Sequence, residues 1–84
     1  MNSFDELFTL TQKVGEGSQS IIYECIEKDT QDKFIVKKMR NRDIESLVNL
    51  KEEYRILKNL NHPHIIKVFY LFINDKTSVS HMIF

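Results

Sequence analysis

Apolar and polar residues alternate along the chain in five short runs that predict β-strands. An alternation with period two is typical of a strand that buries one of its faces. The first three runs come early in the chain, and the last two flank the polar turn Asn74 to Thr77. The five runs are Phe8 to Val14, Ile21 to Ile26, Phe34 to Met39, Ile65 to Ile73 and Ser78 to Phe84.

Between the third and fourth runs the period changes to that of an amphipathic helix, from about Ile44 to Asn59. At about 100° per residue, one broad face collects large apolar side chains, with Ile56 at its margin. These are Leu47, Leu50, Tyr54, Leu57 and Leu60. Asp43 is a residue type that caps helix N-termini. The helix and the strands predict an α+β fold, a five-stranded antiparallel sheet with one main helix packed on it.

A short N-terminal helix is also predicted. Ser3 and Glu6 have the spacing of a capping box, which favours one helical turn before the first strand.

Two opposite charges interrupt apolar patterns on neighbouring elements. Glu53 falls inside the apolar arc of the helix, where an unpaired carboxylate costs several kcal/mol to desolvate. Lys37 interrupts an apolar strand, and alternation places it on the same face as Ile35. This pattern predicts a Lys37–Glu53 ion pair. The alternative is that Glu53 lies at the edge of the apolar arc and reaches water.

Composition narrows the range of functions. A chain of 84 residues is one small domain, and its 42% apolar and 29% charged residues indicate a globular protein. Twelve basic residues balance twelve acidic ones, so we expect neither nucleic acid nor a membrane surface as a partner. Residues 1–7 include Asp5 and Glu6 and no apolar core run, so we expect no signal peptide, and no run of about 20 apolar residues occurs in this sequence. We therefore expect a cytoplasmic protein, with the nucleus as the alternative.

Cysteine and histidine add little chemistry. Cys25 is the only cysteine, so no internal disulfide can form, and its apolar run predicts a small buried side chain. His62 and His64 flank Pro63, which favours a turn because proline disfavours helix in the residue before it. Two such histidines without further ligands make a poor metal site, so we predict none.

A pair of glycines separates the first two predicted strands. Gly15 and Gly17 lack a Cβ, which allows backbone to approach a ligand and its N–H groups to form a small anion-binding nest. By itself the pair is more typical of an ordinary hairpin tip.

The order of three features is more specific than any one of them. A glycine-rich hairpin, a strand lysine and a helix glutamate follow one another as in the protein-kinase signature set. The chain resembles the N-terminal lobe of a protein kinase, most like a serine/threonine kinase of the calmodulin-dependent type. The resemblance covers about residues 8–84 and leaves residues 1–7 as a short leader.

The resemblance implies an ATP site. Gly15 and Gly17 match the first two loop glycines, Lys37 the lysine on the α- and β-phosphates, and Glu53 the glutamate that holds this lysine. Ser20 stands at the third glycine position, and Ile35 stands where the family usually has alanine, which narrows the adenine pocket. The implied nucleotide-binding residues are Val14, Gly15, Gly17, Ser20, Ile22, Ile35, Lys37, Glu53 and Phe84, with Phe84 at the gatekeeper position.

The family's catalytic loop and its D-F-G motif do not occur in this sequence. We therefore expect no catalytic base in this chain, and Mg²⁺ only where a C-terminal lobe supplies its ligands. The complete enzyme would transfer a phosphoryl group from ATP to a protein Ser/Thr hydroxyl, while the chain alone is not expected to do so.

Three interpretations stay open. The chain is the ATP-binding part of a kinase, or a non-catalytic docking module, or a small α+β domain in which Lys37 and Glu53 form a structural ion pair. A docking module would use an apolar underside that carries Val14, Ile22, Ile35 and Phe84 as its protein-binding surface.

Overall fold

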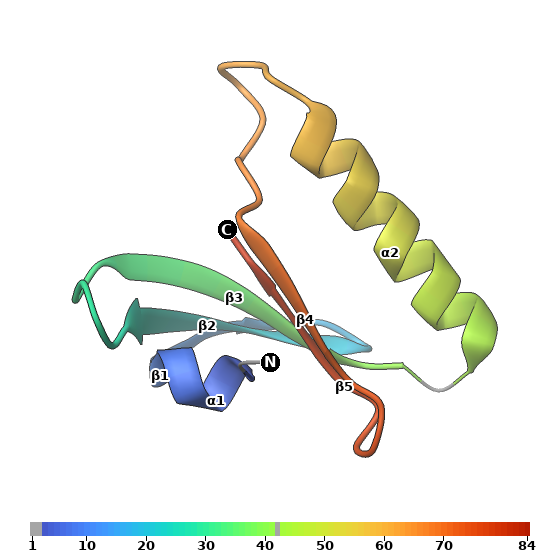
Figure 1. Cartoon of the computed structure of the whole chain (residues 1–84), viewed down its shortest axis with the longest axis horizontal. Helices are drawn as coiled ribbons and strands as arrows, with labels where there is room; N and C mark the ends of the chain where they lie inside the picture. Colours follow the sequence, from blue (N-terminus) through green and yellow to red (C-terminus); the bar gives the residue numbers. More distant parts are fainter. Residues whose placement is uncertain (1–2, 42) are drawn as a thin grey trace.

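The computed structural model describes residues 3–41 and 43–84 of the chain. The five strands form one antiparallel sheet in the order β1-β2-β3-β5-β4. Figure 1 shows helix α2 on one side of this sheet and the short helix α1 on the other. The elements are α1 Phe4–Leu7, β1 Phe8–Glu16, β2 Ser20–Glu27, β3 Lys33–Arg40, α2 Ile44–Asn59, β4 Tyr70–Asn74 and β5 Val79–Ile83. The predicted α+β fold is confirmed.

The core is divided by the sheet into two apolar clusters. Neighbouring residues of β5 point to opposite faces, so Met82 belongs to one cluster and Ile83 to the other. On the α2 side, Leu50, Val68 and Met82 are buried together. On the α1 side the buried cluster consists of Phe4, Phe8, Cys25, Val36 and Ile83. Burying each large side chain contributes about 1.5–3 kcal/mol, so both faces stabilise the sheet.

Helix α1 lies within the predicted leader and is part of the core. The Phe4 ring is buried and stacks on Phe8 at 5.3 Å and on His81 at 4.1 Å between ring centroids. The Ser3 hydroxyl donates to the Glu6 carboxylate at 3.2 Å and makes no bond to a backbone N–H. The helical turn is therefore present without a complete capping box. Phe4, more than the cap, holds it on the sheet.

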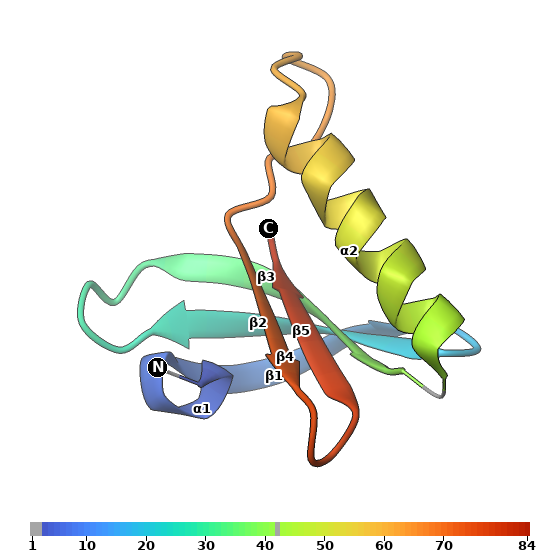
Figure 2. The same cartoon turned by 45° about the vertical axis from the view of Figure 1, so that its right-hand side comes forward.

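Helix α2 has the bounds that its period predicts. The Ser46 N–H donates to the Asp43 carboxylate at 2.7 Å, which confirms the cap and lowers the pKa of Asp43. Leu50 is buried, but the rest of the apolar face is half-buried or exposed. Figure 2 shows the reason, since the helix rises away from β1, β2 and β3 toward its C-terminal end.

The fourth strand is shorter than predicted. Pairing with β5 begins at Tyr70, opposite Ile83, and the Phe69 N–H donates to the Ile83 carbonyl at 2.8 Å. Before Phe69, residues 65–68 lie outside the strands, and the Ile65 N–H bonds back to the His62 carbonyl in a turn. Alternation alone extended the strand too far, because a strand also needs a neighbour to pair with.

Within the part of the chain that the structure describes, no helix has the length and apolar character needed to cross a membrane.

Candidate nucleotide site

The turn between β1 and β2 carries the glycine pair. It is closed by a hydrogen bond of 2.8 Å from the Gly17 N–H to the Ser20 carbonyl. Neither glycine has a positive φ, and a Cβ built on Gly17 would lie 3.5 Å from the Ser20 hydroxyl, an ordinary contact. The conformation of the turn therefore does not itself require glycine.

Register places three of the predicted residues in one row across the sheet. Gly15 on β1 is opposite Ile22 on β2, and Ile22 is opposite Lys37 on β3. The row continues through Met82 on β5 to Leu71 on β4. Residues opposite one another in an antiparallel sheet share a face, so this row lies on the α2 side with Lys37.

The predicted adenine-binding residues lie near this row. Ile35 and Phe84 are directly opposite and exchange two backbone hydrogen bonds of 3.0 and 2.7 Å. Ile35 is two residues from Lys37 on the same strand, so both side chains point to the same face. Ile22, Ile35 and Phe84 are half-buried, whereas Val14 is 57% exposed. Of the predicted apolar underside, only Val14 is strongly exposed.

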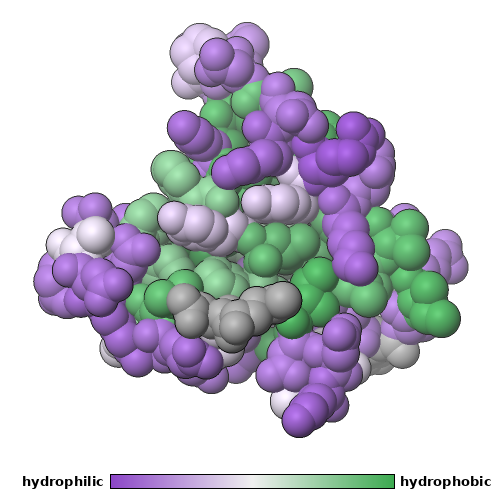
Figure 3. Space-filling model, in the orientation of Figure 1, coloured by the Kyte–Doolittle hydropathy of each residue, from purple (hydrophilic) through white to green (hydrophobic). Residues whose placement is uncertain are grey.

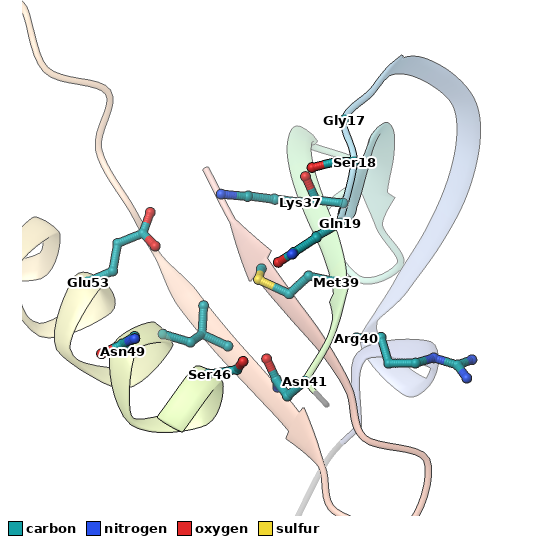
Figure 4. A pocket seen from close by; sticks show the side chains of 12 residues that line it. Gly17, Ser18, Gln19, Lys37, Met39, Arg40, Asn41, Ser46, Asn49 and Glu53 are labelled. Atoms are coloured by element: carbon teal, nitrogen blue, oxygen red, sulfur yellow. The ribbon is translucent and has the colours of Figure 1, made fainter. Parts of the chain in front are cut away.

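A cavity of about 410 Å³ lies between the glycine turn, β3 and α2. Four of the predicted site residues line it, namely Gly17, Ser20, Lys37 and Glu53. Figure 4 shows Lys37 reaching into this space from β3 and Glu53 facing it from α2. Val14, Gly15, Ile22, Ile35 and Phe84 do not line this cavity. The structure therefore brings Gly17, Ser20, Lys37 and Glu53 together, whereas Gly15 and the predicted adenine-side residues lie outside this cavity.

Lys37 and Glu53 do not form the predicted ion pair. The salt bridges among residues 3–41 and 43–84 are Lys13–Glu16 and Glu52–Arg55, both between exposed side chains of one element. Glu53 is exposed, so its carboxylate remains hydrated and does not need a partner. The prediction of a forced pair was wrong in this conformation. It assumed that the whole apolar arc of the helix is buried, whereas α2 buries only Leu50.

Sequence reasoning missed six polar residues of the cavity wall, namely Ser18, Gln19, Arg40, Asn41, Ser46 and Asn49. Ser46 and Asn49 of α2 lie on the same side of the helix as Glu53, and Asn41 follows β3. The spacing of Ser46, Asn49 and Glu53 is i, i+3 and i+7, which marks one helical face. This polar line beside the apolar arc is the signal that could have identified Ser46 and Asn49.

The large pKa shifts among the described residues belong to Cys25 and His81, both outside the cavity. Burial and the charge of Glu24 raise the pKa of Cys25 to about 11, so this thiol stays neutral, as expected of a small buried side chain. Burial and the charge of Lys38 lower the pKa of His81 to about 4. The His62 Nδ1 accepts a hydrogen bond from the His64 N–H, so this side chain stabilises the turn.

The chain is similar to known protein kinases. The family model of the protein kinase domain matches residues 8–84. Serine/threonine-protein kinase 33 of Mus musculus is 34% identical over 70 residues, which are 81% of this chain and 14% of that protein. Calcium/calmodulin-dependent protein kinase type IV of Homo sapiens is 30% identical over 71 residues, 84% of this chain and 15% of that protein.

A solved structure has the same fold. The autoinhibited serine kinase domain of the giant muscle protein titin superposes with a TM-score of 0.87 at 22% identity, over 99% of this chain and 25% of that chain. The likeness extends to the five-stranded sheet with its single main helix, the arrangement of a kinase N-terminal lobe. The chain spans about one seventh of the length of the two curated relatives above. By its sequence match over residues 8–84, the chain belongs to the protein kinase domain family.

Proposed function

We propose that this chain binds ATP, with the phosphates in the cavity between the glycine turn and α2. The observation that carries the proposal is that one cavity collects Gly17, Lys37 and Glu53 from three separate elements. In a complete kinase the bound nucleotide would donate its γ-phosphoryl group to a protein Ser/Thr hydroxyl. We place this activity in the cytoplasm or the nucleus.

The cavity has the chemistry that a polyphosphate needs. The Lys37 ammonium is a compact cation that can neutralise the α- and β-phosphates. Backbone N–H groups of the turn at Gly17 offer further donors, because no Cβ keeps a phosphate away from them. The adenine would lie beside Ile22, Ile35 and Phe84, on the same face as Lys37. Glu53 would hold Lys37 once α2 moves closer to the sheet.

Turnover requires groups beyond this set. Phosphoryl transfer needs positioning and charge neutralisation from both sides of the nucleotide. We propose that Mg²⁺ accompanies ATP and that its protein ligands and the catalytic base belong to a C-terminal lobe. Among the described residues, no group of three or more His, Cys, Asp or Glu side chains is placed to hold a metal ion.

The test is calorimetric titration of the chain with Mg-ATP. Lys37→Met should remove saturable binding or weaken it at least roughly tenfold, because the phosphates lose their cation. The matched control is Lys38→Met, which removes the neighbouring lysine on the opposite face, across from His81. Absence of binding to a chain that is folded by circular dichroism would overturn the proposal. Equal effects of the two substitutions would overturn the assignment to Lys37.

A docking module is the second candidate function, and exposed apolar residues favour it. Ile44 and Val48 are 82% and 57% exposed and one helical turn apart on α2. Figure 3 shows apolar surface protruding where α2 begins. If this surface binds a second copy of the chain, light scattering at increasing concentration should show a dimer that Val48→Ser abolishes. A monomer at every concentration would argue against self-docking.

A further inference from the structure

A buried serine anchors the connection between β3 and α2. Ser80 on β5 is completely buried, and it is the one polar residue in the buried core of the described residues. Its hydroxyl accepts a hydrogen bond from the side-chain amide of Asn41. The backbone N–H of Asn41 also donates to the Ser78 carbonyl at 2.7 Å. Asn41 is therefore joined to the start of β5 by two hydrogen bonds.

These bonds lie immediately before α2. Asn41 follows the last residue of β3, and Asp43 caps the helix through the Ser46 N–H at 2.7 Å. Figure 4 shows Asn41 and Ser46 beside each other at one end of the cavity. Both also line that cavity. Asn41 is thus bonded to β5 and to the residue before that strand, and Asp43, two positions later in the chain, is bonded to the first turn of the helix that carries Glu53.

Beyond its first turn, α2 is held by apolar packing of Leu50, Tyr54 and Leu57 and by one exposed hydrogen bond of 3.1 Å from the Lys58 ammonium to the Phe69 carbonyl. Leu50 is its one buried residue, and apolar packing is non-directional, so these contacts leave the start of the helix free to tilt or slide. A hydrogen bond to a buried hydroxyl is directional, because both groups lose their bonds to water if the geometry is wrong. The Asn41–Ser80 bond is thus the contact that can define where α2 begins.

We propose that Asn41 and Ser80 are positioning residues that fix the start of α2 on β5 and thereby set the separation of Glu53 from Lys37. Glu53 lies ten residues beyond the Asp43 cap, which is about 15 Å along the helix. A tilt of about 10° at the start of the helix would therefore move Glu53 by roughly 2.5 Å. The role of Asn41 and Ser80 in positioning α2 does not depend on ATP. Only the expected change in ATP binding rests on the proposed function.

The test measures the position of α2 directly. Nitroxide labels on Lys33→Cys and Lys51→Cys report the distance between exposed sites on β3 and on α2 by pulsed electron paramagnetic resonance. Cys25 is completely buried, so it does not take up label in the folded chain. The distance is compared for the labelled parent chain, for Ser80→Ala and for Asn41→Ala.

Two further variants make the comparison specific. Asn41→Asp removes the amide donor, but the Ser80 hydroxyl can donate to the new carboxylate, so the contact is kept with its direction reversed and the parent distance should be retained. Ser78→Ala makes the same chemical change two residues from Ser80 on an exposed side chain, and leaves the backbone bond from Asn41 intact. It should also match the parent chain.

For Ser80→Ala and Asn41→Ala, we expect the mean distance to shift by about 1–2 Å or more, with a broader distribution. Ser80→Ala is nearly isosteric and removes a buried polar group, and the half-buried Asn41 amide that loses its partner lines the cavity, where water can bond to it. The unfolding midpoint of this variant should therefore stay close to that of the parent. A purely structural role would instead lower stability and leave the distance unchanged. Parent-like distances in both alanine variants would overturn the proposal. If one of them does not fold, the other decides it.

Nucleotide binding provides the functional readout. Where the parent chain binds Mg-ATP, Ser80→Ala should weaken binding roughly tenfold, because a displacement of about 1 Å at a positioned group is costly. Asn41→Asp should bind as the parent does. If the parent chain does not bind Mg-ATP, the proposed function fails while the label distances still decide the role of Asn41 and Ser80.

Discussion

Lys37 and Glu53 face the same cavity from opposite walls without forming an ion pair. Lys37 is fixed in a row of the sheet, whereas Glu53 is exposed on a helix that buries one residue. We therefore expect closure of the pair to involve movement of α2 and not of β3. This asymmetry makes α2 the adjustable wall of the candidate site.

Glu53→Gln should leave the stability of the chain nearly unchanged and weaken nucleotide binding. Because the carboxylate is exposed and unpaired, we expect the free energy of unfolding in urea to change by less than about 0.5 kcal/mol. Mg-ATP binding should weaken if the pair closes around the nucleotide. Glu52→Gln is the matched control, since Glu52 pairs with Arg55 on the same helix. A loss of more than about 1 kcal/mol would show that Glu53 is already paired in the free chain.

Gly17→Ala should affect binding and leave the fold intact. Gly17 has no positive φ, and the added Cβ would make only an ordinary contact with Ser20. The stability of the chain should therefore be unchanged or rise by about 0.4–1 kcal/mol, because alanine restricts the unfolded chain. We expect weaker Mg-ATP binding, since the Cβ hinders approach of a phosphate to the backbone. Destabilisation by the substitution would contradict the geometry of the turn.

Phe4→Ala should destabilise the chain although Phe4 lies outside the residues matched by the family. The ring is buried between Phe8 and His81, so its removal should cost about 3–5 kcal/mol. In a domain of this size such a loss is expected to unfold much of the population. Asp5→Ala, on the exposed side of the same turn, is the control. A change below about 1 kcal/mol in urea unfolding would mean that α1 does not stabilise the sheet.

His81 should make the chain less stable in mild acid. Its imidazole stacks on Phe4, and the charged groups that act on it are Lys38 on β3 and Asp5 on α1. Burial and Lys38 lower its pKa from 6.5 to about 4, against a smaller opposite effect of Asp5. Between pH 4 and pH 6.5, the unfolded chain therefore binds more protons at His81 than the folded chain does. The contribution of neutral His81 is complete above pH 6.5 and is lost as the pH falls toward 4.

The measurement is urea unfolding at pH 7 and pH 4.5. The midpoint should fall more for the parent chain than for His81→Phe, which keeps a stacking ring without a titrating group. His64→Gln, a change at an exposed turn, should behave as the parent does. An NMR titration of the His81 ring protons should give a pKa well below 6.5. A ring that titrates at its ordinary value would disprove the effect.

Local sequence determined the elements and their faces. Asp43 caps the helix where a capping residue was expected, and α2 has the predicted bounds, because backbone hydrogen bonds and side-chain period act within a few residues. Alternation placed Lys37 and Ile35 on one face of β3 and Val36 on the other, as the two clusters require. The order of motifs was sufficient to identify the family.

Tertiary structure decided what these elements enclose. The start of β4 at Tyr70 depends on where β5 can pair with it, and the exposure of Glu53 depends on how far α2 stands from the sheet. The same is true of Ser46 and Asn49, which became part of the cavity wall only when α2 was placed beside β3. Burial and strand pairing depend on the contact between two segments. The apolar pattern of one segment therefore cannot predict them.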